Sequence, residues 1–573
     1  MKKARNRMCK LLFLICIVSI IQPTVAFADE KTPSLTSKIT ANTYKTSTMN
    51  LLGTSYVRNS DITASFTDIN FRNSILKLLG KSEGSPIYKN DVKDITSLDV
   101  SYKDINSLDG IEYFEKLELL DCAYNQLSVL DISKNTELIN LNCGNNKLAA
   151  LNISSNKNLT DLTCDLNELS VLDISKNTEL TNLDCFWNNL RTLNVSNNKN
   201  LVSLDCGLNQ LTTLDTSENK GLAELYCSGN ALTSLDIRDN TGLIDLDCGG
   251  NQLSTLDISK NTGLTGLCYE DNQLSALDIS KITELTTLNC GGNQLTNLNV
   301  SNNKKLASLY CDRNQLSALD ISRNTGLTEL YCSYNNLSVL DLSKNINLRF
   351  LYCPVNNLST LDISKNTGLT GLYCDGNQLL TLDIRNNKNL SILACSSNKL
   401  STLDIRNNIN LNRLSCSGNN LSTLDISKNT GLTDLYCDSN QMSVLDISNN
   451  KNLNVLSCSD NQLSVLDISN NKNLIVLWCS DNQLSTLDIS NNMLLTYLDC
   501  RNNHLSVLNV SNNKNLDALY CSSNQLSVLD IRNNTLLTEL NCRNNRLSTL
   551  DVSKNPLLSV LECDDKQVNI IGG

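Results

Sequence analysis

The sequence is poor in aromatic residues, proline and histidine. Aromatic side chains make up 4% of the 573 residues, and the chain has only 5 Pro and a single His. So few aromatics exclude a core built on large rings, which leaves aliphatic side chains and cysteine to fill it. The one histidine, His504, stands in a turn position that other repeats fill with Gln. We interpret His504 as a solvated substitution, so neither a Ser-His-Asp triad nor a Cys-His pair is expected.

Cysteine, by contrast, is frequent and periodic. Apart from Cys9 and Cys16, the 24 cysteines begin at Cys122 and recur about every 21 residues up to Cys563. A fixed period of this length is typical of a repeat protein, in which one core grows in a single direction. The chain is therefore predicted to be one array of repeats and not a set of globular domains.

The first residues have the pattern of a secretory signal peptide. Five basic residues precede the apolar run 11–21, and Ala26-Phe27-Ala28 supplies the small residues of a cleavage site. This run is shorter than the roughly 20 residues needed to span a bilayer. We expect cleavage after Ala28, a secreted or extracellular protein, and no membrane insertion afterwards. No Leu-Pro-x-Thr-Gly sorting motif is present, so covalent attachment to a cell wall is not indicated.

The charge of the chain bears on its partners. Loss of the five basic residues of the leader takes the formal net charge from −11 to −16. Such a surface repels nucleic acid and anionic lipid, so neither is an expected partner.

Composition and spacing divide the chain into segments. Asp68 is a plausible N-cap for a short amphipathic helix, and Gly80 is placed to end it. The end of a solenoid exposes apolar side chains and strand edges, which a lid must cover. The predicted segments are a signal peptide (1–28), a flexible lead-in (29–65), an N-terminal helical cap (66–94), a first irregular coil (95–116), about 22 repeats of 21 residues (117–566) and a C-terminal end (567–573).

Each repeat has two similar halves that read L-x-x-L-x-(C/I/V)-x-x-N, for example 180–188 and 190–198. Halves of 10 and 11 residues are too short for an amphipathic helix with its turns, so each predicts one short strand and one turn. The period of two directs Leu and Cys, Ile or Val inward. The expected fold is a β-rich solenoid, a right-handed coil with parallel strands on two sides.

Asparagine closes both halves. The first series runs from Asn125 to Asn545, with Lys566 replacing Asn in the last coil, and the second, which is nearly as complete, runs from Asn135 to Asn555. An inward Asn carries donors and an acceptor that can satisfy the backbone groups of a turn. We interpret both series as structural.

The motif L-x-x-L-x-C-x-x-N-x-L-x-x-L-D-I-S-x-N resembles the nested 21-residue class of secreted bacterial leucine-rich-repeat proteins. The segment from Ile95 to Phe114, with Ile-Asn-Ser-Leu-Asp-Gly-Ile from Ile105, is internalin-like. The resemblance implies a leucine-rich-repeat fold and a binding protein, while the partners of such proteins diverge. The chain departs from wall-anchored internalins because it lacks their sorting signal.

The cysteines of the repeats are predicted to be buried, mostly reduced thiols. Side chains in register run parallel, which strains a disulfide between neighbouring coils, and free Cys behaves as a small hydrophobe. Some disulfides and a metal site remain as alternatives, although the ligand spacing of a metal site is absent. Leu267-Cys268-Tyr269 inverts the pattern, so we expect Tyr269 inward and Cys268 outward as an exposed thiol.

Aspartate fills 17 of the 21 outward second-strand positions from Asp131 to Asp551. A glycosidase uses one local pair of carboxylates, whereas these aspartates repeat along the whole array, so they do not indicate a catalytic pair. We interpret it as a solvated face balanced by Lys and Arg, with weak calcium binding as the alternative. No enzyme activity, cofactor or metal site is expected.

The outward residue of the first strand varies from coil to coil, and only such positions can encode a partner. Four successive coils place Tyr there, with aromatic and Arg neighbours, a combination favoured in binding hot spots. Stacked tyrosines can also stabilise neighbouring strands without any ligand. The candidate binding residues are Tyr310, Tyr331, Tyr352, Tyr373, Phe350, Tyr334, Arg313 and Arg413.

Three functions fit this face. The first is recognition of a protein partner, in adhesion or in contact with a host or neighbouring cell surface. The second is binding of a polysaccharide by the row of aromatics, and the third is a passive extracellular spacer. Binding to a protein should weaken with salt, whereas stacking on sugars should not. The sequence indicates no particular oligomeric state.

Overall fold

The structure is a computed structural model that describes residues 59–564 and 568–572. The predicted signal peptide, most of the lead-in and Lys566 lie outside these residues. All described helices and strands belong to the unit that runs from Asn59 to Gly573. Within the described part of the chain, no helix combines the length and apolar character that crossing a bilayer requires.

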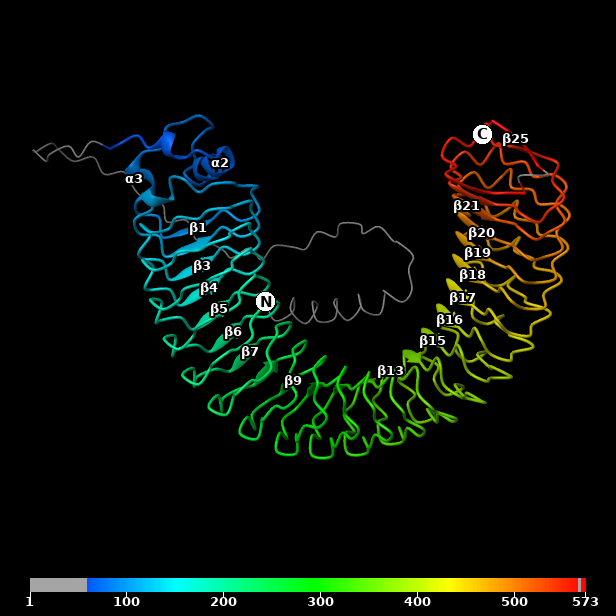
Figure 1. Cartoon of the computed structure of the whole chain (residues 1–573), viewed down its shortest axis with the longest axis horizontal. Coiled ribbons are helices and arrows are strands. Elements are labelled where there is room, and N and C mark those ends of the chain that lie inside the picture. Colours follow the sequence, from blue (N-terminus) through cyan, green and yellow to red (C-terminus); the bar gives the residue numbers. More distant parts are fainter. Residues whose placement is uncertain (1–58, 565–567, 573) are drawn as a thin grey trace, which may run out of the picture. The chain divides into compact units, whose positions relative to one another are not determined.

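The main sheet has 23 parallel strands of three residues each. Each strand pairs in register with the strand one coil away, so that Leu351 lies between Leu330 and Leu372. The sheet follows the inner side of the stacked coils (Figure 1). Its strands are β1 (Ser97–Asp99), β2 (Leu119–Asp121), β3 (Asn140–Asn142), β4 (Asp161–Thr163), β5 (Asn182–Asp184), β6 (Ser203–Asp205), β7 (Glu224–Tyr226), β8 (Asp245–Asp247), β9 (Gly266–Cys268), β10 (Thr287–Asn289), β11 (Ser308–Tyr310), β12 (Glu329–Tyr331), β13 (Phe350–Tyr352), β14 (Gly371–Tyr373), β15 (Ile392–Ala394), β16 (Arg413–Ser415), β17 (Asp434–Tyr436), β18 (Val455–Ser457), β19 (Val476–Trp478), β20 (Tyr497–Asp499), β21 (Ala518–Tyr520), β22 (Glu539–Asn541) and β24 (Val560–Glu562).

The predicted parallel-strand solenoid is confirmed, and its two sides differ in hydrogen bonding. On the second side, only β23 (Thr549–Asp551) and β25 (Asn569–Ile571) pair as strands among the described residues. In the other coils the corresponding segments are not assigned as strands. Because the sheet lies on the inner side of the curve, coils spread apart on the outer side, beyond the reach of ladder hydrogen bonds.

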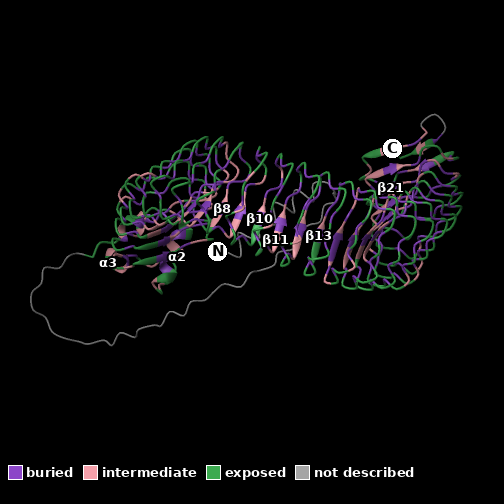
Figure 2. Ribbon diagram, turned by 90° about the horizontal axis from the view of Figure 1, so that it is seen from below, coloured by how far each residue is buried: buried purple, intermediate pink, exposed green. Residues whose placement is uncertain are grey.

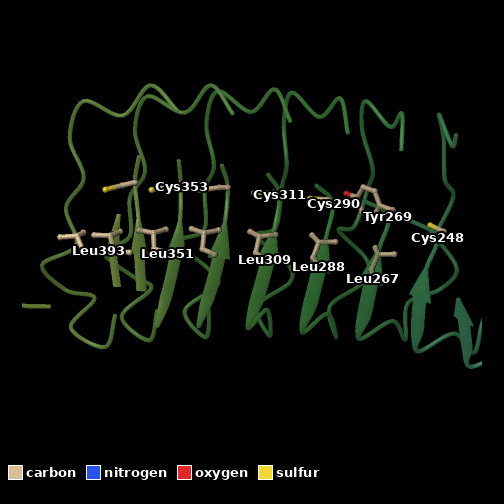
Figure 3. Close-up of a cluster of buried hydrophobic side chains, with 14 of the residues drawn as sticks. Cys248, Leu267, Tyr269, Leu288, Cys290, Leu309, Cys311, Leu351, Cys353 and Leu393 are labelled. Carbon is tan, nitrogen blue, oxygen red and sulfur yellow. The ribbon is translucent and has the colours of Figure 1, made fainter. Parts of the chain in front are cut away.

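Most coils contribute six apolar side chains to one continuous core, while in one coil the buried Thr216 takes the place of the sixth. In the coil of β12 all six are at most 5% exposed, and Figure 3 shows how Leu and Cys form parallel rows through neighbouring coils. Burial of one Leu contributes about 1.5–3 kcal/mol, so the repeated pattern is the main source of stability. The six residues are Leu327, Leu330, Cys332, Leu337, Leu340 and Leu342.

The predicted inversion in one coil is confirmed. Tyr269 is fully buried in the cysteine row between Cys248 and Cys290 (Figure 3). Cys268 lies on the outward face of β9 and is partly exposed. The local sequence determines this outcome, because exchange of two neighbours in a strand exchanges their faces.

The two asparagine series satisfy backbone groups in different ways. In the first series, Asn335 Oδ1 accepts a hydrogen bond from Leu316 N at 2.9 Å, and Nδ2 donates to Cys311 O and Cys332 O at 3.0 and 3.2 Å. In the second, Asn345 Nδ2 donates to the carbonyl oxygens of Ile321 and Asn324 at 3.1 and 2.9 Å. Their structural role is therefore confirmed.

The N-terminal end contains the expected short helix, α2 (Ile69–Leu78). Asp68 Oδ1 accepts hydrogen bonds from Asn70 N and Phe71 N at 2.8 and 2.9 Å, and Gly80 ends the helix with a φ of 64°. The helix is only one part of the cover at this end, since Phe66, which lies outside it, packs on Phe71 of the helix and on Phe114, with ring centroids 5.4 and 6.5 Å away. The other short elements here are η1 (Thr63–Ser65), α3 (Lys89–Val92) and η2 (Ile111–Tyr113).

Candidate functional site

Four tyrosines form a continuous row on the outward face of β11–β14. The ring centroids of Tyr310 and Tyr331 are 4.7 Å apart, those of Tyr331 and Tyr352 are 5.6 Å apart, and those of Tyr352 and Tyr373 are 5.1 Å apart. We call these four residues the tyrosine ladder. All four are partly buried, in a stretch of the sheet whose outward residues are largely of intermediate exposure (Figure 2).

The ladder presents neutral phenols. Burial raises the pKa of Tyr331 and of Tyr352 to about 12, and it also raises the pKa of Tyr373. Burial and then a hydrogen bond from the Tyr310 hydroxyl to Glu329 Oε2, 2.6 Å long, raise the pKa of Tyr310. Each phenol therefore keeps its proton at neutral pH.

The two remaining aromatic residues of the predicted site, Phe350 and Tyr334, flank the ladder. Phe350, the first residue of β13, is 39% exposed, and its ring covers the backbone of Gly371, where an added Cβ would lie 2.9 Å from Phe350 Cδ1. Tyr334 is 47% exposed in the turn after β12, with a φ of 50°. The structure thus gathers six predicted aromatic residues in neighbouring coils.

The two predicted arginines lie in different surroundings. The guanidinium carbon of Arg413 is 5.5 Å from the ring centroid of Tyr436, and its charge acts on Tyr373, at one end of the ladder. Arg313 instead forms ion pairs with Asp271 at 3.2 Å and with Asp312 at 3.4 Å. Arg313, which the sequence analysis grouped with the aromatic residues, therefore lies among carboxylates instead.

The sequence prediction missed a second aromatic group on the same face. Tyr497 lies between Trp478 and Tyr520, with ring centroids 5.6 and 5.4 Å away, and the guanidinium carbon of Arg501 is 5.4 Å from the Tyr520 ring centroid. Trp478 and Tyr520 occupy the variable position two coils apart, while the coil between them has Asp499 there. Tyr497, the first residue of β20, places its ring between Trp478 and Tyr520. The sequence prediction considered only the variable third position of each strand and therefore missed Tyr497.

The aspartates of the second side have local structural partners. Each accepts a hydrogen bond from the backbone N–H two residues on, as Asp320 Oδ1 does from Ser322 N at 2.9 Å. Four of them also bind the side chain of an Arg at that position, as in the pair of Asp236 and Arg238 at 2.6 Å. Among the residues that the structure describes, no three His, Cys, Asp or Glu side chains converge as metal ligands would.

These Asp–Arg pairs predict a pH-dependent contribution to stability. Hydrogen bonds from the Arg side chain and backbone lower the pKa of each Asp from 3.8 to about 2. A lowered folded-state pKa stabilises the fold above the unfolded pKa, and this contribution disappears as pH falls from about 4 to about 2. We expect a fourfold Arg→Ser variant to have a slightly lower urea midpoint at pH 5 and the wild-type midpoint at pH 2. The four positions are Arg238, Arg385, Arg406 and Arg532.

Comparison with known proteins gives matches among solved structures. The functional domain of InlJ from Listeria monocytogenes, which includes a cysteine ladder, is 30% identical over 73% of this chain and 79% of that chain, with a TM-score of 0.43. A leucine-rich-repeat protein of Leptospira interrogans is 24% identical over 69% of this chain and 98% of that one, with a TM-score of 0.51. The ectodomain of the Arabidopsis receptor kinase HAESA, solved with a peptide hormone ligand, is 23% identical over 82% and 90% of the two chains, with a TM-score of 0.63. No protein-family model and no curated protein sequence matches.

Coils of 21 residues, one parallel sheet and two inward asparagine series define a leucine-rich-repeat solenoid. The Leptospira and Arabidopsis structures, below 25% identity, support this fold alone. The 30% sequence identity with InlJ, over most of that domain, supports membership of a family and not only a shared fold. This support rests on the sequence identity and not on the superposition of the two structures. The chain belongs to the internalin-like leucine-rich-repeat proteins.

Proposed function

We propose that the chain is a secreted protein-recognition module, which binds a partner on a host or neighbouring cell surface through the outward face of the sheet. The observation that carries this proposal is the tyrosine ladder, with Phe350 and Tyr334 beside it. Partly buried aromatic side chains that are held rigidly lose little conformational entropy on binding and dominate many protein interfaces. The apolar leader and its small cleavage-site residues support secretion.

The packing of the rings favours a protein partner over a polysaccharide. Tyr331 lies between Tyr310 and Tyr352, at 24° and 29° to their planes, so its two faces are turned to neighbouring rings. A sugar would need an open ring face, whereas a protein can contact ring edges and hydroxyl groups. The HAESA ectodomain, which shares the fold, holds a peptide ligand, and this also supports a polypeptide partner.

The test is binding of the purified protein to an array of cell-surface proteins and glycans, beside a variant with all four ladder tyrosines changed to Ser. We expect a protein ligand whose affinity falls at least about 100-fold in the variant, because several hot-spot rings are lost together. The fold should tolerate the change, since β16 and β18 carry Ser415 and Ser457 at the same position.

A matched control changes a stacked pair outside the ladder. Tyr102 and Tyr124 have ring centroids 4.1 Å apart, and their replacement by Ser should leave binding unchanged. Binding that weakens with salt supports a protein interface, since charged groups flank the ladder. A salt-insensitive glycan ligand would replace our proposal with the polysaccharide function, and no ligand for either protein would favour the passive spacer.

A further inference from the structure

Glycine and acidic residues alternate in four successive coils, the last of which carries Tyr310 of the tyrosine ladder. The position after the cysteine row is occupied by Gly249, Glu270, Gly291 and Asp312 in turn. An added Cβ at Gly249 would lie 3.0 Å from Glu270 Cγ, and one at Gly291 would lie 3.1 Å from Asp312 Oδ1. Each acidic side chain therefore folds over the glycine of the preceding coil and is withdrawn from water.

These residues form a group with excess negative charge. Glu270 accepts a hydrogen bond from Asn289 Nδ2 at 2.6 Å, and Arg313 pairs with two other carboxylates, at 3.2 and 3.4 Å. The group contains four carboxylates and one guanidinium, and we call it the carboxylate cluster. Its members are Asp247, Glu270, Asp271, Asp312 and Arg313.

One oxygen of the cluster is buried without any hydrogen-bond partner. Asp312 is 6% exposed, and its Oδ1, which lies over Gly291, has no hydrogen-bond partner. A buried acceptor left without a donor costs about 1–3 kcal/mol, and more when it is charged. A positively charged hydrogen-bond donor would both satisfy this oxygen and offset the excess negative charge of the cluster.

The cluster is continuous with the tyrosine ladder. Asp312 lies two residues after Tyr310, the last residue of β11, and its charge contributes to the raised pKa values of Tyr331 and Tyr352. A partner that covers the ladder therefore also reaches the cluster. This contact excludes water and strengthens any ion pair formed there.

We propose that the carboxylate cluster receives a Lys or Arg side chain of the protein partner, next to the ladder. The inference rests on the proposed function and adds the chemistry of the partner, which must present a basic residue beside an apolar or aromatic segment. A metal ion fits less well, because no three acidic or other ligating side chains of the described residues converge on one point.

Proton linkage gives the proposal a distinctive signature. Burial, more than the neighbouring charges of Asp247, Asp271 and Asp312, raises the pKa of Glu270 to about 7, while the bond from Asn289 opposes the rise. A cation bound beside Glu270 lowers that pKa, so binding releases part of a proton near pH 7. By the same linkage, affinity for the cation rises as pH increases from 6 to 8.

The experiment is calorimetric titration of the purified protein with triarginine amide, against tricitrulline amide as the uncharged probe. Titration at pH 7 in buffers of different ionisation enthalpy counts the protons released. We compare the wild type with the double variant Glu270→Gln and Asp312→Asn. The control with the same loss of charge is Asp131→Asn with Asp173→Asn on the second side, where Asn152 natively accepts the equivalent hydrogen bond.

We expect triarginine to bind at least ten-fold more weakly to the cluster variant, with no proton release, and to bind the control as it binds the wild type. Equal weakening in both variants would show binding to general surface charge and overturn the proposal. Absence of proton release in the wild type, or of any binding, would also overturn it. The ladder tyrosines are untouched here, so these outcomes are independent of the Tyr→Ser test of the proposed function.

Discussion

Replacement of Asn335 by Leu is expected to lower the free energy of unfolding by about 3 kcal/mol. The amide oxygen of Asn335 accepts a hydrogen bond from Leu316 N, which is buried and donates to no other acceptor, so the substitution leaves this donor unsatisfied. The carbonyls of Cys311 and Cys332 each keep a second donor, from Asn314 and Asn356. Most of the cost therefore comes from one buried N–H group.

Urea unfolding monitored by circular dichroism measures the change, and two variants serve as controls. Asn336→Ala alters an exposed side chain of the same turn and should change stability by less than about 0.5 kcal/mol. Asn345→Leu should cost less than Asn335→Leu, since its amide oxygen has no hydrogen-bond partner. Ile282 occupies the position of the Asn345 series in another coil. Equal losses for Asn335 and Asn345 would contradict this assignment of roles.

The sequence was sufficient to predict features that depend on spacing along the chain. The 21-residue period determines the stacking of Leu and Cys, and the period of two within a strand determines that Tyr269 is buried and Cys268 is outward. The inward asparagines follow from the same register. The gathering of the ladder tyrosines was also predictable, because residues 21 apart meet in neighbouring coils.

Features that depend on side-chain direction or on curvature could not be predicted. Arg313 reaches Asp271, which is two coils away, and not the rings beside it. The burial of Glu270 and Asp312 requires a glycine at the same position in the preceding coil. It therefore depends on the combination of residues in two neighbouring coils and not on the motif of one repeat. The second side lacks a continuous sheet because the coils spread there, and spacing along one repeat contains no information on the angle between coils.

Thiol chemistry should differ sharply between the folded and unfolded protein. None of the 22 described cysteines is joined in a disulfide, and all but Cys268 are buried. Burial raises the pKa of their thiols, for example that of Cys332 from 9.0 to about 12, which lowers its thiolate fraction about 1000-fold. At pH 8 we expect a disulfide reagent to find at most one slowly reacting thiol among the described cysteines of the native protein.

The same reagent should find at least 22 thiols after unfolding in urea without reductant. Cys268→Ser should remove the remaining native reaction, because Cys268 is the one described cysteine with partial exposure. Its own reaction is slow, since burial and then the charges of Asp247 and Glu270 raise its pKa. A count well below 22 would reveal disulfides between coils and contradict the packing of parallel thiols. The thiol count after unfolding and the reaction rate of the folded protein therefore test the same packing. In that packing, the coil that buries Tyr269 also exposes the thiol of Cys268 beside the carboxylate cluster.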